Sequence, residues 1–290
     1  MKETILVTGA SGTIGRELVR YLISNNICVR IAARDEQKVK EFENCGCPVI
    51  KFDFEKSETF GKAFEGISGF FLSVPLRYPR IDEFILPAIE AAKKFGVVHI
   101  VSLGAIGIGL DRETPLSVLE QCIKHCGLQY TILRPNLLMQ TMLALSSQTL
   151  RQTREIRLPA GDARISFVDA RDIAESAAIA LVDASHRNKI YNLTGAEALS
   201  HTDIATILSR ISGKTITYIP ISHNEAQSKL ILEGWTLEKI SMMIGLYEIA
   251  RHGWCETVFP DLANLLEREP LRFEQFADDY KKSWIDFHEK

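Results

Sequence analysis

The residues most suited to ligand chemistry are three glycines near the start of the chain, Gly9, Gly12 and Gly15, at intervals of three. They follow an apolar run at residues 5–8 that is typical of a buried parallel strand, and an apolar stripe at helical spacing follows them. Glycines in such a turn let a pyrophosphate approach bare N–H groups at a helix N-terminus. A tight turn without a ligand is the alternative. The pattern predicts a dinucleotide site formed by Gly9, Ser11, Gly12, Thr13, Ile14 and Gly15.

The end of the second predicted strand, residues 27–33, indicates which dinucleotide is bound. A carboxylate there would accept hydrogen bonds from a ribose 2′-hydroxyl, whereas an arginine matches a 2′-phosphate. Ala33 stands where the acid is expected, Arg34 follows it, and Lys38 lies one turn later. The pattern favours NADP(H), and Asp35 is then interpreted as a helix cap. NAD(H) is the alternative, because a shift of one or two residues would bring Asp35 to the ribose.

Further cofactor contacts are expected where the third and fourth predicted strands end, since parallel strands end at one edge of a sheet. Asp53 and Phe54 could meet the adenine amino group and ring. The loop formed by Ser73, Val74 and Pro75 should pass along the far phosphate and the nicotinamide ribose. Asn136 could orient a carbonyl or shape a turn. The substrate pocket is predicted among Leu76, Tyr78, Leu103, Gly104, Asn136 and Met139.

Strands and helices alternate regularly through the first half of the chain. Such a pattern indicates βαβ crossovers, a parallel sheet and helices on both of its faces. The predicted fold class is therefore α/β, with a doubly wound parallel sheet in residues 1–134. Residues 135–290 are expected to form a smaller, mostly helical substrate lobe, interleaved with the first domain. The predicted strands cover residues 5–8, 27–33, 48–52, 69–73, 97–102 and 130–134.

The composition is that of an ordinary globular protein. The 290 residues are 46% hydrophobic and 24% charged, with a net charge of −3, which gives no reason to expect nucleic acid or an acidic membrane surface as a partner. No apolar run approaches the length of a membrane span, and the first residues lead directly into a strand, so a cytoplasmic location is expected. The six cysteines are interpreted as reduced thiols, and no metal is expected.

Several segments together resemble the NmrA-like group of atypical short-chain dehydrogenases, and the similarity covers nearly the whole chain. The resemblance implies a Rossmann fold and an NADPH-dependent quinone or dye reductase, or a relative of isoflavone reductase. The group also contains a transcriptional regulator that binds dinucleotide without obvious turnover. The segments are Thr8–Gly15, Arg34-Asp35, Ser102–Ala105, Tyr130–Gln140, Asn192–Gly195 through Tyr218, and Arg272–Phe276.

The usual catalytic pair of short-chain dehydrogenases is missing, because no tyrosine has a lysine four residues later. Related reductases tend to carry Lys or His at the start of the helix that precedes the strand beginning at Tyr130. At that helix position this chain has Leu116. Glu120 matches a recurrent acid of the group and is interpreted as structural. The catalytic residues are therefore unknown. A quinone accepts hydride at an electron-poor ring and can take its proton from water, so orientation and a dry pocket would suffice.

These observations predict an NADP(H)-dependent oxidoreductase that passes hydride to a small, electron-poor conjugated acceptor such as a quinone or a secondary-metabolite intermediate. The alternative is a nucleotide-sensing regulator that binds NAD(P) and a protein partner without turnover. The expected partners are a small-molecule substrate in the first case and a regulatory protein in the second. A homodimer is compatible with both.

Overall fold

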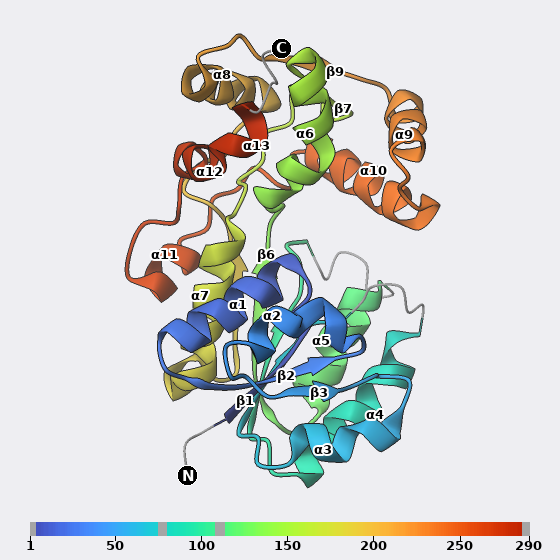
Figure 1. Ribbon diagram of the computed structural model, residues 1–290, viewed down its shortest axis with the longest axis vertical. Helices are drawn as coiled ribbons and strands as arrows, with labels where there is room; N and C mark the ends of the chain where they lie inside the picture. Colours follow the sequence, from blue (N-terminus) through green and yellow to red (C-terminus); the bar gives the residue numbers. More distant parts are fainter. Residues whose placement is uncertain (1–3, 75–79, 108–113, 286–290) are drawn as a thin grey trace. The chain divides into compact units, whose positions relative to one another are not determined.

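The computed structural model describes residues 4–74, 80–107 and 114–285. The chain divides into two compact units and passes between them several times, and each unit is described separately (Figure 1). The first unit contains Met1–Pro135, Ala170–Leu193 and Asn264–Glu267, and the second contains Asn136–Asp169, Thr194–Ala263 and Arg268–Lys290.

A parallel sheet forms the centre of the first unit. Its seven strands have the order β3-β2-β1-β4-β5-β6-β8, and every pair is parallel. The order steps outward on both sides of β1, as in a doubly wound Rossmann sheet, so the predicted fold class is confirmed. The strands are β1 (Thr4–Thr8), β2 (Cys28–Ala33), β3 (Val49–Lys51), β4 (Gly69–Leu72), β5 (His99–Leu103), β6 (Gln129–Pro135) and β8 (Lys189–Leu193).

Helices cover the sheet because their apolar stripes pack against its buried strands. In α1, Leu18, Val19 and Leu22 recur at helical spacing and are fully buried, and α1 packs beside α7. A second core forms where α3, α4 and α5 meet the sheet. The helices are α1 (Thr13–Ser24), α2 (Lys40–Glu43), α3 (Phe60–Phe64), α4 (Ile81–Lys94), α5 (Pro115–His125) and α7 (Ala170–Val182), with short 3₁₀ turns at η1 (Glu36–Val39), η2 (Ser57–Thr59) and η3 (Ala184–His186).

The second unit is mostly helical around a two-stranded parallel sheet of β7 and β9. Two of its helices begin with a capping box, Ser200 with Asp203 in α8 and Ser222 with Glu225 in α9. One of the boundaries between the two units falls within α11. The elements are α6 (Gln140–Thr153), β7 (Glu155–Leu158), α8 (His201–Ser212), β9 (Thr217–Pro220), α9 (His223–Leu232), α10 (Leu237–Arg251), α11 (Asp261–Leu266), α12 (Phe273–Asp279) and α13 (Lys281–Ile285).

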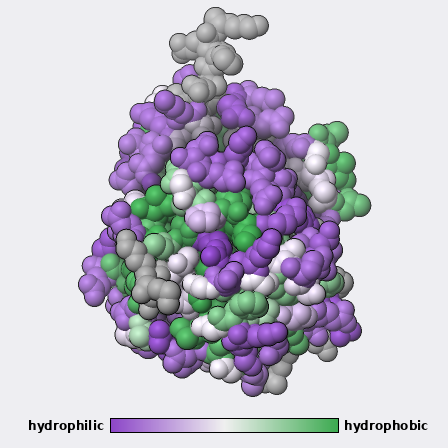
Figure 2. Space-filling view, turned by 60° about the horizontal axis from the view of Figure 1, so that its bottom comes forward, coloured by the Kyte–Doolittle hydropathy of each residue, from purple (hydrophilic) through white to green (hydrophobic). Residues whose placement is uncertain are grey.

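Figure 2 shows one face on which hydrophilic residues surround a smaller group of apolar residues near the middle. Among the described residues, large exposed apolar side chains include Leu232, Leu237 and Trp254, all in the second unit. No helix in the described part of the chain combines the length and the apolar character needed to cross a bilayer.

Candidate dinucleotide-binding site

The turn between β1 and α1 leaves backbone N–H groups available at the helix start. Gly9 has a φ of +72°, and the Gly12 N–H donates to the Gly9 carbonyl at 2.9 Å, which closes the turn. Gly12 is the N-cap of α1 and, having no side chain, offers no capping hydrogen bond. The first N–H groups of a helix have no partner within the helix, so this end of α1 is suited to bind an anion.

Steric crowding requires glycine at two positions of this turn. A Cβ atom built on Gly15 would lie 2.2 Å from the Gly9 carbonyl oxygen, which is backbone and cannot move aside easily. A Cβ atom on Gly9 would lie 2.8 Å from the Ser73 Oγ atom, in a backbone conformation that already favours glycine. The glycine spacing therefore allows α1 to pack directly on the end of β1.

Thr8 ties the glycine turn to the loop after β4. Its Oγ1 atom accepts a hydrogen bond from the Ser73 N–H at 2.9 Å and lies 3.0 Å from the Phe71 carbonyl and 3.2 Å from the Ser73 carbonyl, either of which can accept its hydrogen. Only 2% of Thr8 is exposed. Sequence reasoning assigned Thr8 to the strand and missed this role, although a hydroxyl at the end of a buried apolar run signals a need for hydrogen bonding.

A cleft at the carboxyl ends of β1, β2 and β3 brings together seven of the predicted cofactor residues: Gly9, Ser11, Arg34, Lys38, Asp53, Phe54 and Ser73. Gly12, Thr13, Ile14 and Gly15 form the adjoining start of α1, and Val74 follows Ser73 and packs against the core. Pro75 lies outside the described residues. Sequence reasoning considered two further lining residues, Ala33 and Asp35, only at the place of a ribose-binding acid, and did not place the others in the site: Thr8, Ala10, Ala32 and Phe52.

The charged tip of β2 presents cations to this cleft. The Asp35 carboxylate accepts a hydrogen bond from the Gln37 N–H at 3.2 Å and caps η1, so the prediction that Asp35 is a helix cap is confirmed. Arg34 and Lys38 are exposed, and neither side chain has a hydrogen bond or ion pair with any described residue. Two uncommitted cations beside a capping carboxylate are suited to a phosphate group.

Asp53 and Phe54, which follow β3, line the same cleft. The Asp53 Oδ1 atom accepts a hydrogen bond from the Glu55 N–H at 3.2 Å, which orients the carboxylate. The Phe54 ring lies edge-on to Phe52, with centroids 4.9 Å apart, and Phe52 belongs to a buried aromatic cluster. A supported ring and an oriented carboxylate fit the adenine contacts predicted for these two residues.

The predicted substrate residues are divided among different parts of the chain. Leu76 and Tyr78 lie outside the described residues. Leu103 ends β5, and the Gly104 N–H donates to the Leu133 carbonyl at 2.7 Å, so both lie at the carboxyl edge of the sheet in the first unit. Asn136 and Met139 belong to the second unit. A pocket shared by these residues remains a prediction.

Asn136 is fully engaged in hydrogen bonds within the second unit. Its Nδ2 donates to the Ser166 Oγ at 2.8 Å and to the Cys255 carbonyl at 2.9 Å, and its Oδ1 accepts from the Leu137 N–H. Only 7% of the residue is exposed. Of the two roles considered for Asn136, shaping the turn therefore fits better than orienting a substrate. Met139 is buried in the core of this unit.

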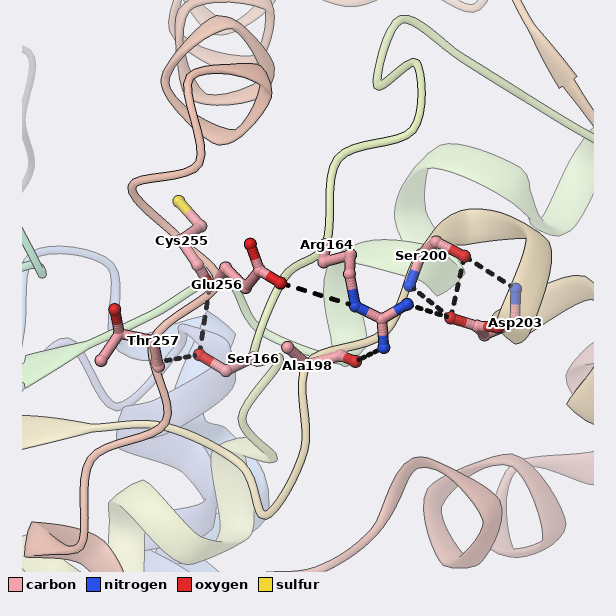
Figure 3. Close-up of polar contacts among 8 residues, drawn as sticks. All are labelled: Arg164, Ser166, Ala198, Ser200, Asp203, Cys255, Glu256 and Thr257. Carbon is pink, nitrogen blue, oxygen red and sulfur yellow. Dashed lines mark hydrogen bonds and ion pairs between the residues drawn. The ribbon is translucent and has the colours of Figure 1, made fainter.

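A polar network extends from the same region (Figure 3). Ser166 donates to the carbonyl of either Cys255 or Thr257, and the Arg164 guanidinium reaches the Asp203 carboxylate at 3.2 Å and that of Glu256 at 3.7 Å. These contacts join three separate segments of the second unit. The groups that Ser166 and Arg164 contact all belong to the protein, so we interpret the network as structural.

Glu120 and Leu116, the residues considered for proton transfer, lie on α5 in the first unit. Burial would raise the pKa of Glu120, but hydrogen bonds from Arg134 at 3.0 Å and Lys124 at 2.6 Å outweigh it and lower the pKa. Glu120 is therefore held ionised as a structural partner. Leu116 packs against the core. Neither residue can deliver a proton.

Known proteins resemble this chain over nearly its full length. A model of the NmrA-like family matches residues 1–277. The chain is similar to an NAD(P)H azoreductase of Xenophilus azovorans, with 30% identity over 94% of this chain and 96% of the relative. Its fold is similar to that of triphenylmethane reductase from Citrobacter sp., with 24% identity, a TM-score of 0.85 and coverage of 96% and 99% of the two chains. It is also similar to the NADPH complex of the quinone oxidoreductase QOR2 from Escherichia coli, with 23% identity, a TM-score of 0.83 and the same coverage.

Proposed function

This chain belongs to the NmrA-like family, and from that premise we propose that it is an NADP(H)-dependent reductase that transfers hydride to a small, flat, electron-poor acceptor such as a quinone or an azo dye. The similarity to an NAD(P)H azoreductase over nearly the full length of both chains supports the reductase assignment. The family resemblance inferred from the sequence is thereby confirmed, and the choice of acceptor is our proposal.

The observation that carries the cofactor assignment is the pair of uncommitted cations at the tip of β2. Arg34 and Lys38 line the same cleft as Gly9, and Asp35, the acid next to Arg34 in sequence, is engaged in capping η1. A 2′-phosphate carries charge that two cations can match, whereas the 2′-hydroxyl of NADH calls for a carboxylate acceptor. The cleft therefore fits NADPH better than NADH.

Bound NADPH would supply the hydride, and the protein's own residues would hold it in place. The start of α1 would bind the pyrophosphate, Arg34 and Lys38 the 2′-phosphate, and Asp53 and Phe54 the adenine. Because Glu120 is locked in ion pairs and Leu116 is apolar, an acceptor that draws its proton from water suits this chain best. Quinones and azo compounds are acceptors of that kind.

The test is calorimetric titration of the purified protein with NADPH and with NADH. Absorbance at the reduced-nicotinamide band is then followed after quinones, azo dyes and cationic dyes are added. We expect tighter binding of NADPH and oxidation of the bound cofactor by at least one class of acceptor. Failure to bind either dinucleotide would refute the proposal.

A second candidate function is a dinucleotide-sensing regulator with a protein partner, as in the non-catalytic branch of the family. Leu116, at the place where related reductases have a proton donor, is the observation that favours it. Tight NADPH binding without oxidation by any acceptor in the panel would support this alternative over the reductase.

A further inference from the structure

Lys51, the last residue of β3, reaches across to the tip of β2. Lys51 pairs in register with Ala33, and its Nζ donates a hydrogen bond to the carbonyl oxygen of the next residue, Arg34, at 2.5 Å. Lys51 is exposed and does not line the dinucleotide cleft. Its ammonium group therefore contacts the backbone that carries Arg34 and not the cleft itself.

The neighbouring backbone is fixed by other contacts on both sides of Arg34. The Phe52 N–H donates to the Ala33 carbonyl at 3.0 Å, which extends the β2–β3 pairing. The Asp35 carbonyl accepts from the Lys38 N–H at 3.3 Å, and the Asp35 side chain caps η1. Among the described residues, only Lys51 donates to the Arg34 carbonyl. In the described structure, the bond from Lys51 is therefore the contact that holds the Arg34 carbonyl itself.

The direction of the peptide that follows Arg34 matters because arginine recognises phosphate through a planar fork of N–H donors. The backbone sets the direction in which this flexible side chain leaves the chain, and Arg34 has no side-chain partner in the described structure that could orient it instead. We propose that Lys51 is a positioning residue for cofactor choice, which holds the Arg34 carbonyl so that the Arg34 guanidinium meets the 2′-phosphate of NADPH. This inference rests on the proposed function.

The experiment is a double-mutant cycle measured by calorimetry with NADPH and NADH. The variants are Lys51→Met, which keeps the aliphatic stem, Arg34→Ala and the double variant, with Lys51→Arg as the conservative replacement. Lys62→Met is the matched control, since Lys62 is an exposed lysine on α3 of the same unit. The cycle separates an effect that acts through Arg34 from a direct effect of the Lys51 charge on the phosphate.

We expect Lys51→Met to raise the Kd for NADPH by roughly 3–10-fold, the range of one lost hydrogen bond, and to leave the Kd for NADH unchanged. Lys51→Arg should restore most of the NADPH affinity, and Lys62→Met should have no effect. In the Arg34→Ala background, Lys51→Met should cause no further loss. A merely structural role would weaken the binding of both dinucleotides together.

Three outcomes would overturn the inference. Equal losses for NADPH and NADH would show that Lys51 maintains the fold of the turn. The same NADPH loss with and without Arg34 would show that Lys51 acts by its own charge. An NADPH preference that requires Arg34 but is unaffected by Lys51→Met would refute this inference alone. A wild-type protein that binds neither dinucleotide would refute both the inference and the proposed function.

Discussion

The cleft residues of the first unit and the buried polar residues of the second unit differ in how far along the chain their hydrogen-bond partners lie. In the first unit, Gly12 bonds to Gly9 and Gln37 to Asp35, within one turn of the chain, although Thr8 bonds to Ser73 over 65 residues. In the second unit, Asn136 bonds to Cys255, 119 residues away. In the cleft of the first unit, Arg34 and the start of α1 stay available for a ligand. In the second unit, the Asn136 amide donates its hydrogens to other segments of the protein.

The buried histidines of the two units also differ, in whether their ring nitrogens have hydrogen-bond partners. His99 in β5 forms a hydrogen bond with Thr131 at 2.9 Å through Nε2. His201 in α8 is completely buried among the rings of Phe167, Tyr218 and Tyr247, and neither of its ring nitrogens has a hydrogen-bond partner in the described structure. The cleft therefore combines short-range contacts with the bond between Thr8 and Ser73, whereas the second unit depends on long-range packing. Each prediction below tests one side of this comparison.

The largest effect is expected for Gly15→Ala in the first unit. The added Cβ would lie 2.2 Å from the Gly9 carbonyl oxygen, so α1 must move away from the end of β1. We expect a loss of about 3 kcal/mol of unfolding free energy, at the upper end for overpacked sites, and loss of measurable dinucleotide binding. Urea denaturation and calorimetry measure the two effects.

Gly61→Ala is the matched control for this prediction. Gly61 lies in α3 of the same unit, and a Cβ there would meet the nearest atom, of Phe95, at an ordinary contact distance of 3.5 Å. This variant should keep wild-type dinucleotide affinity and at least wild-type stability, since alanine favours a helix over glycine. If Gly15→Ala also retained both, the strict need for glycine in the β1–α1 turn would be refuted.

His201 should make the second unit sensitive to acid. Burial lowers the pKa of His201 to about 4, below the usual value of 6.5, so the unfolded chain binds more protons between these two pH values. Stability should therefore fall as the pH drops from about 6.5 towards 4, by on the order of 3 kcal/mol from this residue. His201→Phe should flatten that part of the stability curve in urea denaturation across this pH range.

His99 provides the comparison within the first unit. Its pKa is also lowered to about 4, by burial and by the nearby Arg187 and His186. His99→Phe should flatten the curve over the same pH range but should also lose stability at neutral pH, because the hydrogen bond between His99 and Thr131 is lost. His201→Phe removes no hydrogen bond seen in the described residues. A neutral-pH loss that is larger for His201→Phe than for His99→Phe would contradict this difference.

The sequence was sufficient to predict what depends on short-range patterns. Alternating strands and helices predicted the doubly wound sheet, and the spacing of Gly9, Gly12 and Gly15 predicted the tight turn. It could not show that Thr8 bonds across to Ser73, or that Lys51 bonds to Arg34, because strand pairing decides which distant residues become neighbours. Nor could it choose between the two roles of Asn136, whose partners are 30 and 119 residues away.

Arg34→Ala is expected to have the smallest effect on stability. It should also be the variant that best separates NADPH binding from NADH binding. Arg34 is exposed and its side chain has no partner in the described structure, so stability should not change. NADPH binding should weaken by about 1.5–3 kcal/mol for each charge-assisted hydrogen bond lost, whereas NADH binding should be unaffected. Arg151→Ala is the control, since it removes the same charge from an exposed position on α6 of the second unit. Calorimetry with both cofactors measures the effect, and equal losses for NADPH and NADH would mean that Arg34 does not recognise the 2′-phosphate.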